Sequence, residues 1–333
     1  MPGRQVAHAT APAQADLTAA PPAGETAPYR ILAQGDLGGM GQGEVLSERD
    51  GAALIGYSGK DERDAAVLAM GSADFAVPDT AFSAATGASA PFADALIDDA
   101  HALAAPAAPA SAYDVAIVDT AVSGEVAASI SVLGEGSTHA TGHGDATLEA
   151  IKSEFPAARI LAIEALDGSG TGSSASVYAA MMAAIEAGPK VIALPLSARA
   201  LAGNAAVEEA VLQAHAAGII VVGAAGNDAA DARWFVPGGI AAIVVAGACD
   251  AEGSVLVSSN RGATVDAYVP SPSTSHAAAV MAGYLAFRSS FESLEADIAD
   301  AIARGKFFAY APPEPIGIER MGILSMLSVC WLD

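Results

Sequence analysis

Between Tyr113 and Gly226, short apolar runs alternate with segments of helical periodicity. The apolar runs at 113–119, 158–166, 190–196 and 219–226 lack the polar alternation of half-exposed strands, and helical segments lie between them at 145–155, 174–188 and 205–218. Strands that are apolar on both sides and are joined by helices are typical of a sheet covered on both faces. The pattern therefore predicts an α/β fold with a mostly parallel central sheet.

Composition divides the rest of the chain into further segments. In chain order we expect a disordered Ala/Pro/Thr-rich segment at 1–27, a small α+β unit at 28–104, a Pro/Ala linker at 105–112, the α/β domain at 113–311 and an apolar tail at 312–333. Within the small unit the pattern predicts a strand at 51–58, a helix at 60–70 and an extended stretch at 74–85.

Charge and cysteine content narrow the classes of function. The 333 residues carry 15 basic and 38 acidic side chains, a formal net charge of −23, which disfavours nucleic acid and anionic membranes as partners. No apolar run approaches the roughly 20 residues that span a bilayer, so we expect no transmembrane segment. Cys249 and Cys330 form no disulfide or metal-binding pattern, and neither do His8, His101 and His215, so no metal site is expected.

Four polar residues stand where the pattern switches between strand and helix. Asp119 ends an apolar strand, His143 precedes a helix, Asn227 follows another strand, and Ser275 precedes the apolar run after it. Taken singly, each has an ordinary interpretation as a helix cap or turn residue. In parallel α/β sheets, however, ligands bind outside the carboxyl ends of the strands, which is where these residues are expected.

The order Asp, His, Ser along the chain is the order of the subtilisin triad. Four stretches resemble the sequence boxes of subtilisin-like serine proteases, the subtilases or peptidase S8 family. "VAIVDTAV" resembles the aspartate box, "GHGD" the histidine box, "GIIVVGAAGND" the oxyanion-asparagine box and "STSHAAAVMAG" the serine box. The resemblance covers about 113–287 and implies a subtilisin-like three-layer fold.

The resemblance also implies a serine endopeptidase and a role for each site residue. Asp119, His143 and Ser275 would be the catalytic triad, with Ser275 both nucleophile and helix cap, and Asn227 would complete the oxyanion hole. Two further segments would bind substrate: the backbone of Gly168, Ser169 and Gly170 as a pairing edge, and Leu194, Pro195, Leu196 and Ser197 as the wall of the S1 pocket.

The partners expected from the resemblance are a peptide or protein substrate and the chain's own N-terminal segment as an intramolecular inhibitor. Residues 28–104 correspond in position to a propeptide, with an accessory domain as the alternative, and self-cleavage is expected between about Ala104 and Tyr113. No cofactor is expected. The resemblance allows structural calcium, but no calcium site can be identified in the sequence. The first 24 residues lack the apolar core of a signal peptide, which predicts a cytoplasmic protein, whereas the resemblance implies a secreted or periplasmic one.

Several positions depart from the family pattern and keep alternatives open. Ala121, Asp145, Ser273 and Ala279 replace the usual residues, and the segment before Ser273 is short, so an inactive pseudoprotease used for binding is the first alternative. A dinucleotide-binding domain, suggested by the glycines of "DGSGTGSS", is the remote one, because the full Gly-x-Gly-x-x-Gly spacing is absent. His139 is a competing candidate for the base, and His276, beside the nucleophile, is a candidate for tuning it.

Overall fold

The computed structural model describes residues 29–35, 37, 39–49, 52–58, 60–70, 73–78, 81–83, 112–133, 142–199, 204–288 and 293–309. The segment 1–27, nearly all of the linker 105–112 and the tail 312–333 lie outside these residues, as does His139. What the sequence predicts for them therefore stays a prediction.

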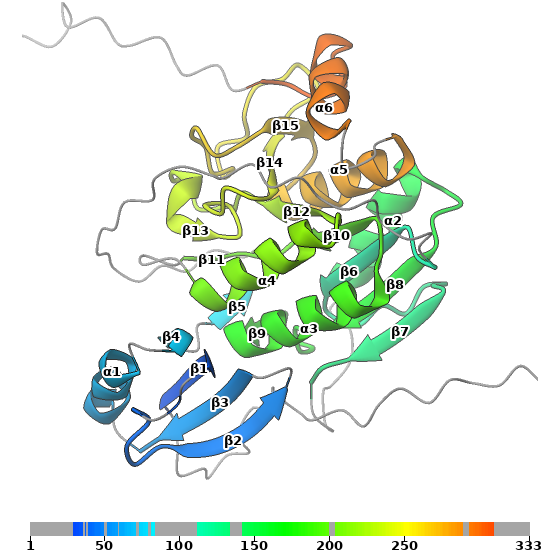
Figure 1. Ribbon diagram of the computed structural model, residues 1–333. Coiled ribbons are helices and arrows are strands. Elements are labelled where there is room, and N and C mark those ends of the chain that lie inside the picture. Colours follow the sequence, from blue (N-terminus) through cyan, green and yellow to red (C-terminus); the bar gives the residue numbers. More distant parts are fainter. Residues whose placement is uncertain are drawn as a thin grey trace, which may run out of the picture.

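A seven-stranded sheet forms the middle of the molecule (Figure 1), with strand order β15-β14-β12-β10-β6-β8-β7 and every neighbouring pair parallel. Its strands are β6 (Val115–Asp119), β7 (Ala128–Ser131), β8 (Ile160–Glu164), β10 (Val191–Leu194), β12 (Ile220–Ala224), β14 (Val244–Cys249) and β15 (Ala267–Pro270). Four of the five interior strands, β6, β10, β12 and β14, are buried along their whole length, and β8 is buried except at Glu164. This burial explains their apolar composition and confirms the predicted parallel sheet.

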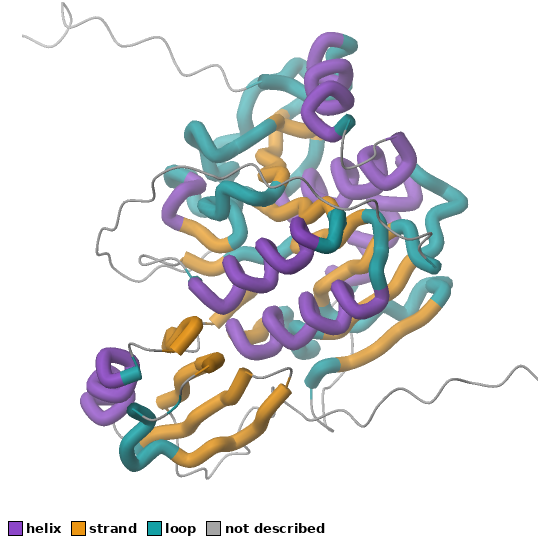
Figure 2. The backbone as a smooth tube through the Cα atoms, in the orientation of Figure 1, coloured by secondary structure: helices purple, strands orange, loops and turns teal. Residues whose placement is uncertain are grey.

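Helices cover both faces of the sheet, so the domain has three layers (Figure 2). On one face, α3 (Ser174–Ala187) and α4 (Ala205–Ala216) enclose one apolar cluster with the sheet. On the other, α2 (His143–Glu154) and α5 (Thr274–Arg288) enclose a second, joined by α6 (Leu294–Ala303). These helices are rich in alanine, whose small side chain lets a helix pack closely against strands.

The N-terminal unit is a separate antiparallel sheet of order β2-β3-β1-β4 with one helix. Its elements are β1 (Tyr29–Gly35), β2 (Glu44–Arg49), β3 (Ala52–Tyr57), α1 (Lys60–Ala69) and β4 (Ala73–Pro78). Leu32 and Leu54 belong to the same buried cluster as α3 and α4, and the Tyr178 hydroxyl donates a hydrogen bond to Gln34 Oε1 at 3.2 Å. The predicted strand and helix at 51–70 are confirmed, whereas β1 and β2 were not predicted.

Four short strands lie outside the two sheets. β5 (Ala81–Ser83) pairs antiparallel with β9 (Thr171–Ser173), and β11 (Ala198–Arg199) pairs antiparallel with β13 (Phe235–Val236), which follows the 3-10 helix η1 (Ala232–Trp234). β5 comes from the N-terminal segment and β9 from the α/β domain. The two parts of the chain are therefore joined by backbone hydrogen bonds as well as by apolar contact.

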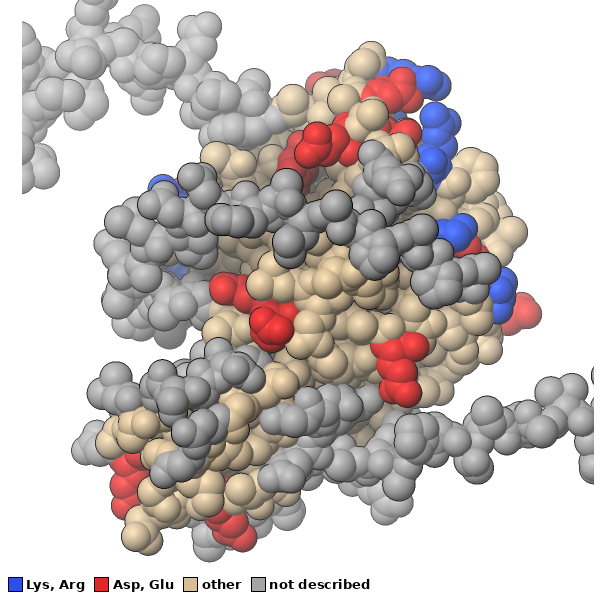
Figure 3. All heavy atoms as spheres, viewed as in Figure 1, with Lys and Arg blue, Asp and Glu red and all other residues tan. Residues whose placement is uncertain are grey.

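Charged side chains are unevenly distributed on the face drawn in Figure 3, where acidic residues form small separate groups and basic residues gather near α5 and α6. There, Arg304 pairs with Asp300 at 2.8 Å and Lys306 pairs with Glu154 at 2.8 Å. The acidic groups match the scattered pattern of the sequence. Among the described helices, none has the length and apolar character needed to cross a membrane.

Candidate active site

Asp119 and His143 form a hydrogen-bonded pair at the carboxyl edge of the sheet. Asp119 is the last residue of β6 and is fully buried, and His143 is the first residue of α2. His143 Nδ1 lies 2.7 Å from Asp119 Oδ1 and 2.8 Å from Oδ2. A carboxylate only accepts hydrogen bonds, so Nδ1 carries the proton and Nε2 is left as the basic nitrogen of the neutral ring.

Two further donors hold the Asp119 carboxylate. The Thr120 backbone N–H donates to Oδ1 at 2.6 Å, and the Thr147 hydroxyl donates to Oδ2 at 2.7 Å. Thr147 lies four residues after His143 on α2, so one helix face supplies both the imidazole and its support. A buried carboxylate is tolerable only when its oxygens are bonded in this way.

The pair also sets the pKa of His143. Burial alone lowers this pKa, but the hydrogen bond and the negative charge of Asp119 together outweigh burial and raise it above the ordinary histidine value. The protonated ring is thus stabilised, and the neutral ring is the form that can accept a proton.

Gly144 lets α2 begin close to the loop that follows β6. A Cβ there would lie 2.6 Å from Thr120 O and 2.9 Å from Ala121 O, and the Gly144 N–H donates to Thr120 Oγ1 at 3.0 Å. Asp145, one of the departures from the family pattern, accepts hydrogen bonds from the Ser123 and Gly124 backbone N–H groups at 2.8 and 2.9 Å. Its carboxylate therefore fastens the same loop to the helix.

Ser275 is the second residue of α5 and is 2% exposed. Its Oγ is buried without a hydrogen-bond partner among the described residues. The helix is capped instead by Ser273, whose Oγ accepts from the His276 N–H at 3.3 Å. The expectation that Ser275 is also the cap was therefore wrong, because a residue already inside the first turn does not cap that turn.

Asn227 lies in the loop after β12 and faces the start of α5. Its Oδ1 accepts from the Thr274 N–H at 3.0 Å, and Thr274 Oγ1 accepts from the Gly226 N–H at 3.2 Å, so two hydrogen bonds join loop and helix. With Oδ1 engaged, Nδ2 is directed elsewhere, and it too is buried with no partner among the described residues. Asn227 Nδ2 and Ser275 Oγ are thus two buried polar atoms that have no hydrogen-bond partner among the described residues, both near the N-terminus of α5.

The α2 and α5 helices pack side by side and begin at this edge of the sheet (Figure 1). At Gly283 a Cβ would lie 2.5 Å from Ile151 O, so the two backbones approach too closely there for any other residue. His143 and Ser275 therefore stand at the first residues of two tightly packed helices.

The segment predicted to pair with substrate forms a turn around Asp167. Asp167 Oδ1 accepts from the backbone N–H groups of Ser169 at 2.8 Å and Thr171 at 3.1 Å, and the Gly170 N–H donates to Asp167 O at 2.8 Å. These amide groups are therefore not available to a bound pyrophosphate, which argues against the dinucleotide alternative. Strand pairing occurs directly after the turn, where β9 holds β5; the role of Gly168–Gly170 stays a prediction.

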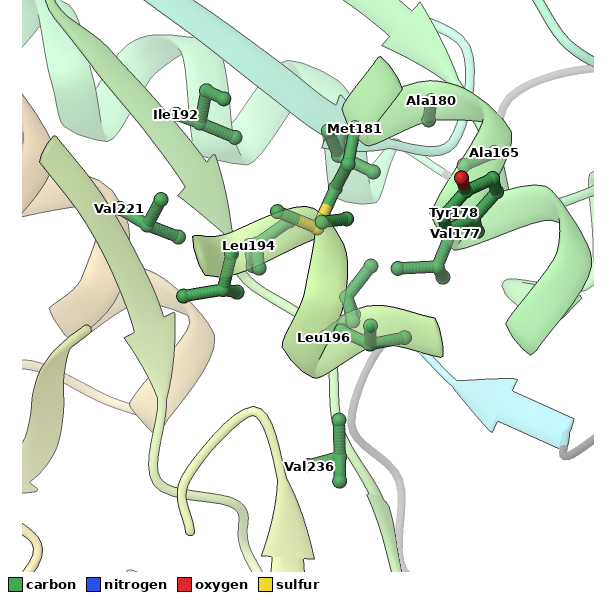
Figure 4. Close-up of a cluster of buried hydrophobic side chains, with 14 of the residues drawn as sticks. Ala165, Val177, Tyr178, Ala180, Met181, Ile192, Leu194, Leu196, Val221 and Val236 are labelled. Carbon is green, nitrogen blue, oxygen red and sulfur yellow. The ribbon is translucent and has the colours of Figure 1, made fainter. Parts of the chain in front are cut away.

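The segment predicted to wall the S1 pocket is buried. Leu194, Leu196 and Ser197 are at most 7% exposed, and the two leucines pack with Met181, Val177 and Val236 (Figure 4). The next two residues form β11, which pairs with β13. The side chains of the two leucines thus fill the core, and the role of this segment, Pro195 included, as a pocket wall stays a prediction.

His276, the candidate for tuning the nucleophile, contacts Ser271. His276 Nδ1 is 3.1 Å from Ser271 Oγ, and burial lowers the His276 pKa. Within the described ranges, no group of three or more His, Cys, Asp or Glu side chains could hold a metal ion. Sequence reasoning missed Thr147 and Thr274, since their contacts join segments that are distant along the chain.

The fold and the Asp119–His143 pair define a three-layer parallel α/β protein with a carboxylate–imidazole pair at its sheet edge. A family model described as "Subtilase family" matches residues 119–298, more than half of the chain. The chain therefore belongs to the subtilase family.

Individual relatives match over a shorter stretch. Subtilisin-like protease 3 of Pseudogymnoascus destructans is 35% identical over 120 residues, 34% of this chain and 29% of that protein. Thermophilic serine proteinase of a Bacillus species is 34% identical over 115 residues, and Extracellular serine proteinase of a Thermus species is 33% identical over 117; each match covers 34% of this chain and 28% of the relative. The matched stretch thus spans less than a third of each relative.

Among solved structures, one titled "Crystal structure of a cold adapted subtilisin-like serine proteinase" is 22% identical. It covers 56% of this chain and 82% of its own, with a TM-score of 0.49.

Proposed function

We propose that the protein is a serine endopeptidase in which Asp119, His143 and Ser275 act as a triad and Asn227 is an oxyanion donor. Ser275 Oγ attacks the peptide carbonyl while His143 Nε2 takes its proton and then gives it to the leaving amine. Asp119 fixes the tautomer of His143 and stabilises the imidazolium. Asn227 Nδ2 and the Ser275 N–H stabilise the oxyanion; one such donor contributes about 2.7–4 kcal/mol.

The observation that carries the proposal is the pair of leftover polar atoms, Ser275 Oγ and Asn227 Nδ2. Burying a polar atom without a partner costs about 1–3 kcal/mol, so such atoms are rare unless a ligand completes them. A tetrahedral intermediate would complete both, since its carbon bonds to Oγ and its oxyanion accepts from Nδ2. Membership of the subtilase family and the Asp119–His143 hydrogen bond support the same assignment.

A fluorophosphonate probe, which modifies activated serines, tests this proposal directly. Wild-type protein should be labelled and Ser275→Ala should not. Ser273→Ala is the matched control, because it removes the neighbouring capping hydroxyl but leaves the proposed nucleophile, and it should still be labelled. Absence of labelling in folded, processed wild type would instead favour the pseudoprotease alternative.

We further propose that the N-terminal unit is a propeptide-like inhibitor that the enzyme removes from itself. β5 lies along β9 in the register Ala81↔Ser173 to Ser83↔Thr171, directly beside the segment expected to bind substrate. The addition of an extended segment to an exposed strand edge is a recurring mode of peptide recognition. This pairing and the packing of Leu32 and Leu54 against the α/β domain support an inhibitory role.

Mass spectrometry of the purified chain tests self-processing. Wild type should be cut between about Ala104 and Tyr113, and Ser275→Ala should stay full length. A cut between Ala104 and Tyr113 would fit the Pro/Ala linker as the site, whereas a cut just after Ser83 would mean that the strand already on the edge is the substrate. Full-length wild type that hydrolyses peptides would show that the N-terminal unit is an accessory domain.

We also propose that the protein is secreted. The name of the Thermus relative, Extracellular serine proteinase, supports this location.

A further inference from the structure

Asn260 is a fully buried residue that contacts the Asn227 loop on both sides of Asn227. On the N-terminal side, Asn260 Nδ2 donates to Ala225 O and the Asn260 N–H donates to Gly226 O, both at 2.8 Å. On the C-terminal side, Asn260 Oδ1 accepts from the Asp228 N–H at 3.0 Å and from the Ala230 N–H at 2.9 Å. Asn260 thus makes four hydrogen bonds to the loop, two to residues before Asn227 and two to residues after it.

We propose that Asn260 is the positioning residue of the oxyanion site: it holds the loop so that Asn227 Nδ2 stays aimed at the reacting carbonyl. The inference rests on the proposed function. Asn260 itself makes its hydrogen bonds to the loop, so it acts through Asn227 rather than on the substrate. Oxyanion donors must lie within about 2.7–3.1 Å of the developing charge, which makes the loop's position decisive.

The chemistry of an asparagine side chain suits this position. Ala225 O needs a donor, whereas the Asp228 and Ala230 N–H groups need an acceptor, and a side-chain amide offers both at its two ends. Aspartate keeps the acceptor and loses the donor, and alanine loses both. The loop also fits the amide closely, since a Cβ at Gly226, whose φ is +100°, would lie 2.4 Å from Asn260 Nδ2.

Asn260 is in turn anchored to the central sheet. The Ser259 hydroxyl, also buried, donates to Asn260 O at 3.0 Å and accepts from the Ala248 N–H of β14 at 3.1 Å. The far side of the loop is joined to α5 through Thr274. Asn227 therefore sits between two rigid elements, and Asn260 makes the link to the sheet.

A double-mutant cycle separates this role from a purely structural one. The variants are Asn260→Ala, Asn227→Leu and the double variant, each expressed as the full chain and left to process itself, with kcat measured per fluorophosphonate-titrated Ser275. Asn260→Ala should lower kcat by about 10- to 100-fold and change KM by less than about threefold, because only transition-state stabilisation is lost. In the Asn227→Leu background the same change should lower kcat by less than about threefold.

Two further variants serve as control and as rescue. Asn204→Ala removes another buried asparagine, whose Nδ2 donates to Ser174 Oγ at 2.7 Å and whose Oδ1 accepts from the Val207 N–H at 3.3 Å. It should lower the melting temperature and leave kcat within about twofold of wild type. Asn260→Asp keeps the acceptor and should retain more activity than Asn260→Ala; if the alanine variant does not fold, Asn260→Asp takes its place in the cycle.

Each outcome decides the inference. An unchanged kcat in Asn260→Ala would overturn it, and so would equal losses with and without Asn227, because the residue would then act by another route. Asn227→Leu with wild-type kcat would overturn the oxyanion assignment itself, and with it this inference. If the fluorophosphonate probe does not label Ser275 in the wild-type protein, the proposed function itself has failed, whatever the variants of Asn260 do.

Discussion

The contact at Gly283 offers the most direct test of how the fold sets the site. Gly283 lies eight residues after Ser275 on α5, and Ile151, whose carbonyl it meets, lies eight residues after His143 on α2. At 1.5 Å per residue, each side chain of the proposed pair is about 12 Å along its own helix from the contact. Moving the helices apart there should displace His143 relative to Ser275.

The size of the displacement follows from the geometry. In Gly283→Ala the new Cβ would be 2.5 Å from Ile151 O, about 0.9 Å short of ordinary contact, and 3.1 Å from Glu154 Cβ. The new Cβ is fixed to the backbone of α5 and Ile151 O belongs to the backbone of α2, so rotation of a side chain cannot relieve the overlap. Overpacking of this kind costs about 1–3 kcal/mol, and a misplacement of about 1 Å can lower the rate about 10²-fold.

The assay is peptide hydrolysis, with kcat compared at a temperature where both proteins are folded, beside urea unfolding. Gly283→Ala should lower kcat by about 10- to 100-fold with a smaller effect on KM. Gly247→Ala is the control, since its Cβ would lie 2.4 Å from the Tyr268 ring and would overpack the core away from the α2–α5 contact. A destabilised Gly283→Ala with wild-type kcat would refute the reasoning.

Three other predictions concern single groups. The pKa of His143 is raised by its pairing with Asp119. The pairing therefore stabilises the fold fully below about pH 6.5, and this stabilisation is lost as the pH rises through the folded pKa. The neutral ring, which is the form that acts as a base, becomes more populated over the same rise in pH. The acid limb of kcat/KM should therefore lie above about 6.5; Asp119→Asn should move it lower and reduce kcat by up to about 10⁴, and an unmoved limb would contradict the pairing. Thr147→Val should lower the free energy of unfolding by about 1–3 kcal/mol, as measured in urea, with Thr147→Ser restoring most of it; an unchanged midpoint would exclude the support of Asp119. Burial and the charge of Asp250 raise the pKa of Cys249 to about 11, so in a Cys330→Ala background iodoacetamide should modify Cys249 only after unfolding, and rapid modification of the folded protein would count against its burial.

The sequence was sufficient for the architecture of the α/β domain because its strands are buried on both sides. A run such as 115–119 is uniformly apolar, and a uniform run between helices has few structural solutions. β1 and β2 were not predicted, although β3 of the same sheet was: the apolar run of β1, at 31–33, is only three residues long. Residues along β2, such as Val45 and Leu46, are exposed, so burial does not impose a clear pattern there.

The candidate site was only partly predictable for a related reason. Asp119 and His143 could be paired because their positions at element ends match a known order. The supports of the site are different, since Thr147, Asn260 and Asp145 act through contacts with segments more than 20 residues away. Threonine, asparagine and aspartate at such places are indistinguishable by sequence from ordinary caps and turn residues.

The pairing of β5 with β9 has a consequence for any peptide that competes for that edge. A strand tethered to the same chain is present at an effective concentration of about millimolar, whatever the dilution of the protein. A free peptide that pairs with β9 must therefore displace β5, whose local concentration does not fall when the protein is diluted. Once the backbone is cut between β5 and the α/β domain, the competitor becomes a separate molecule, and its occupancy of the edge then falls as the solution is diluted.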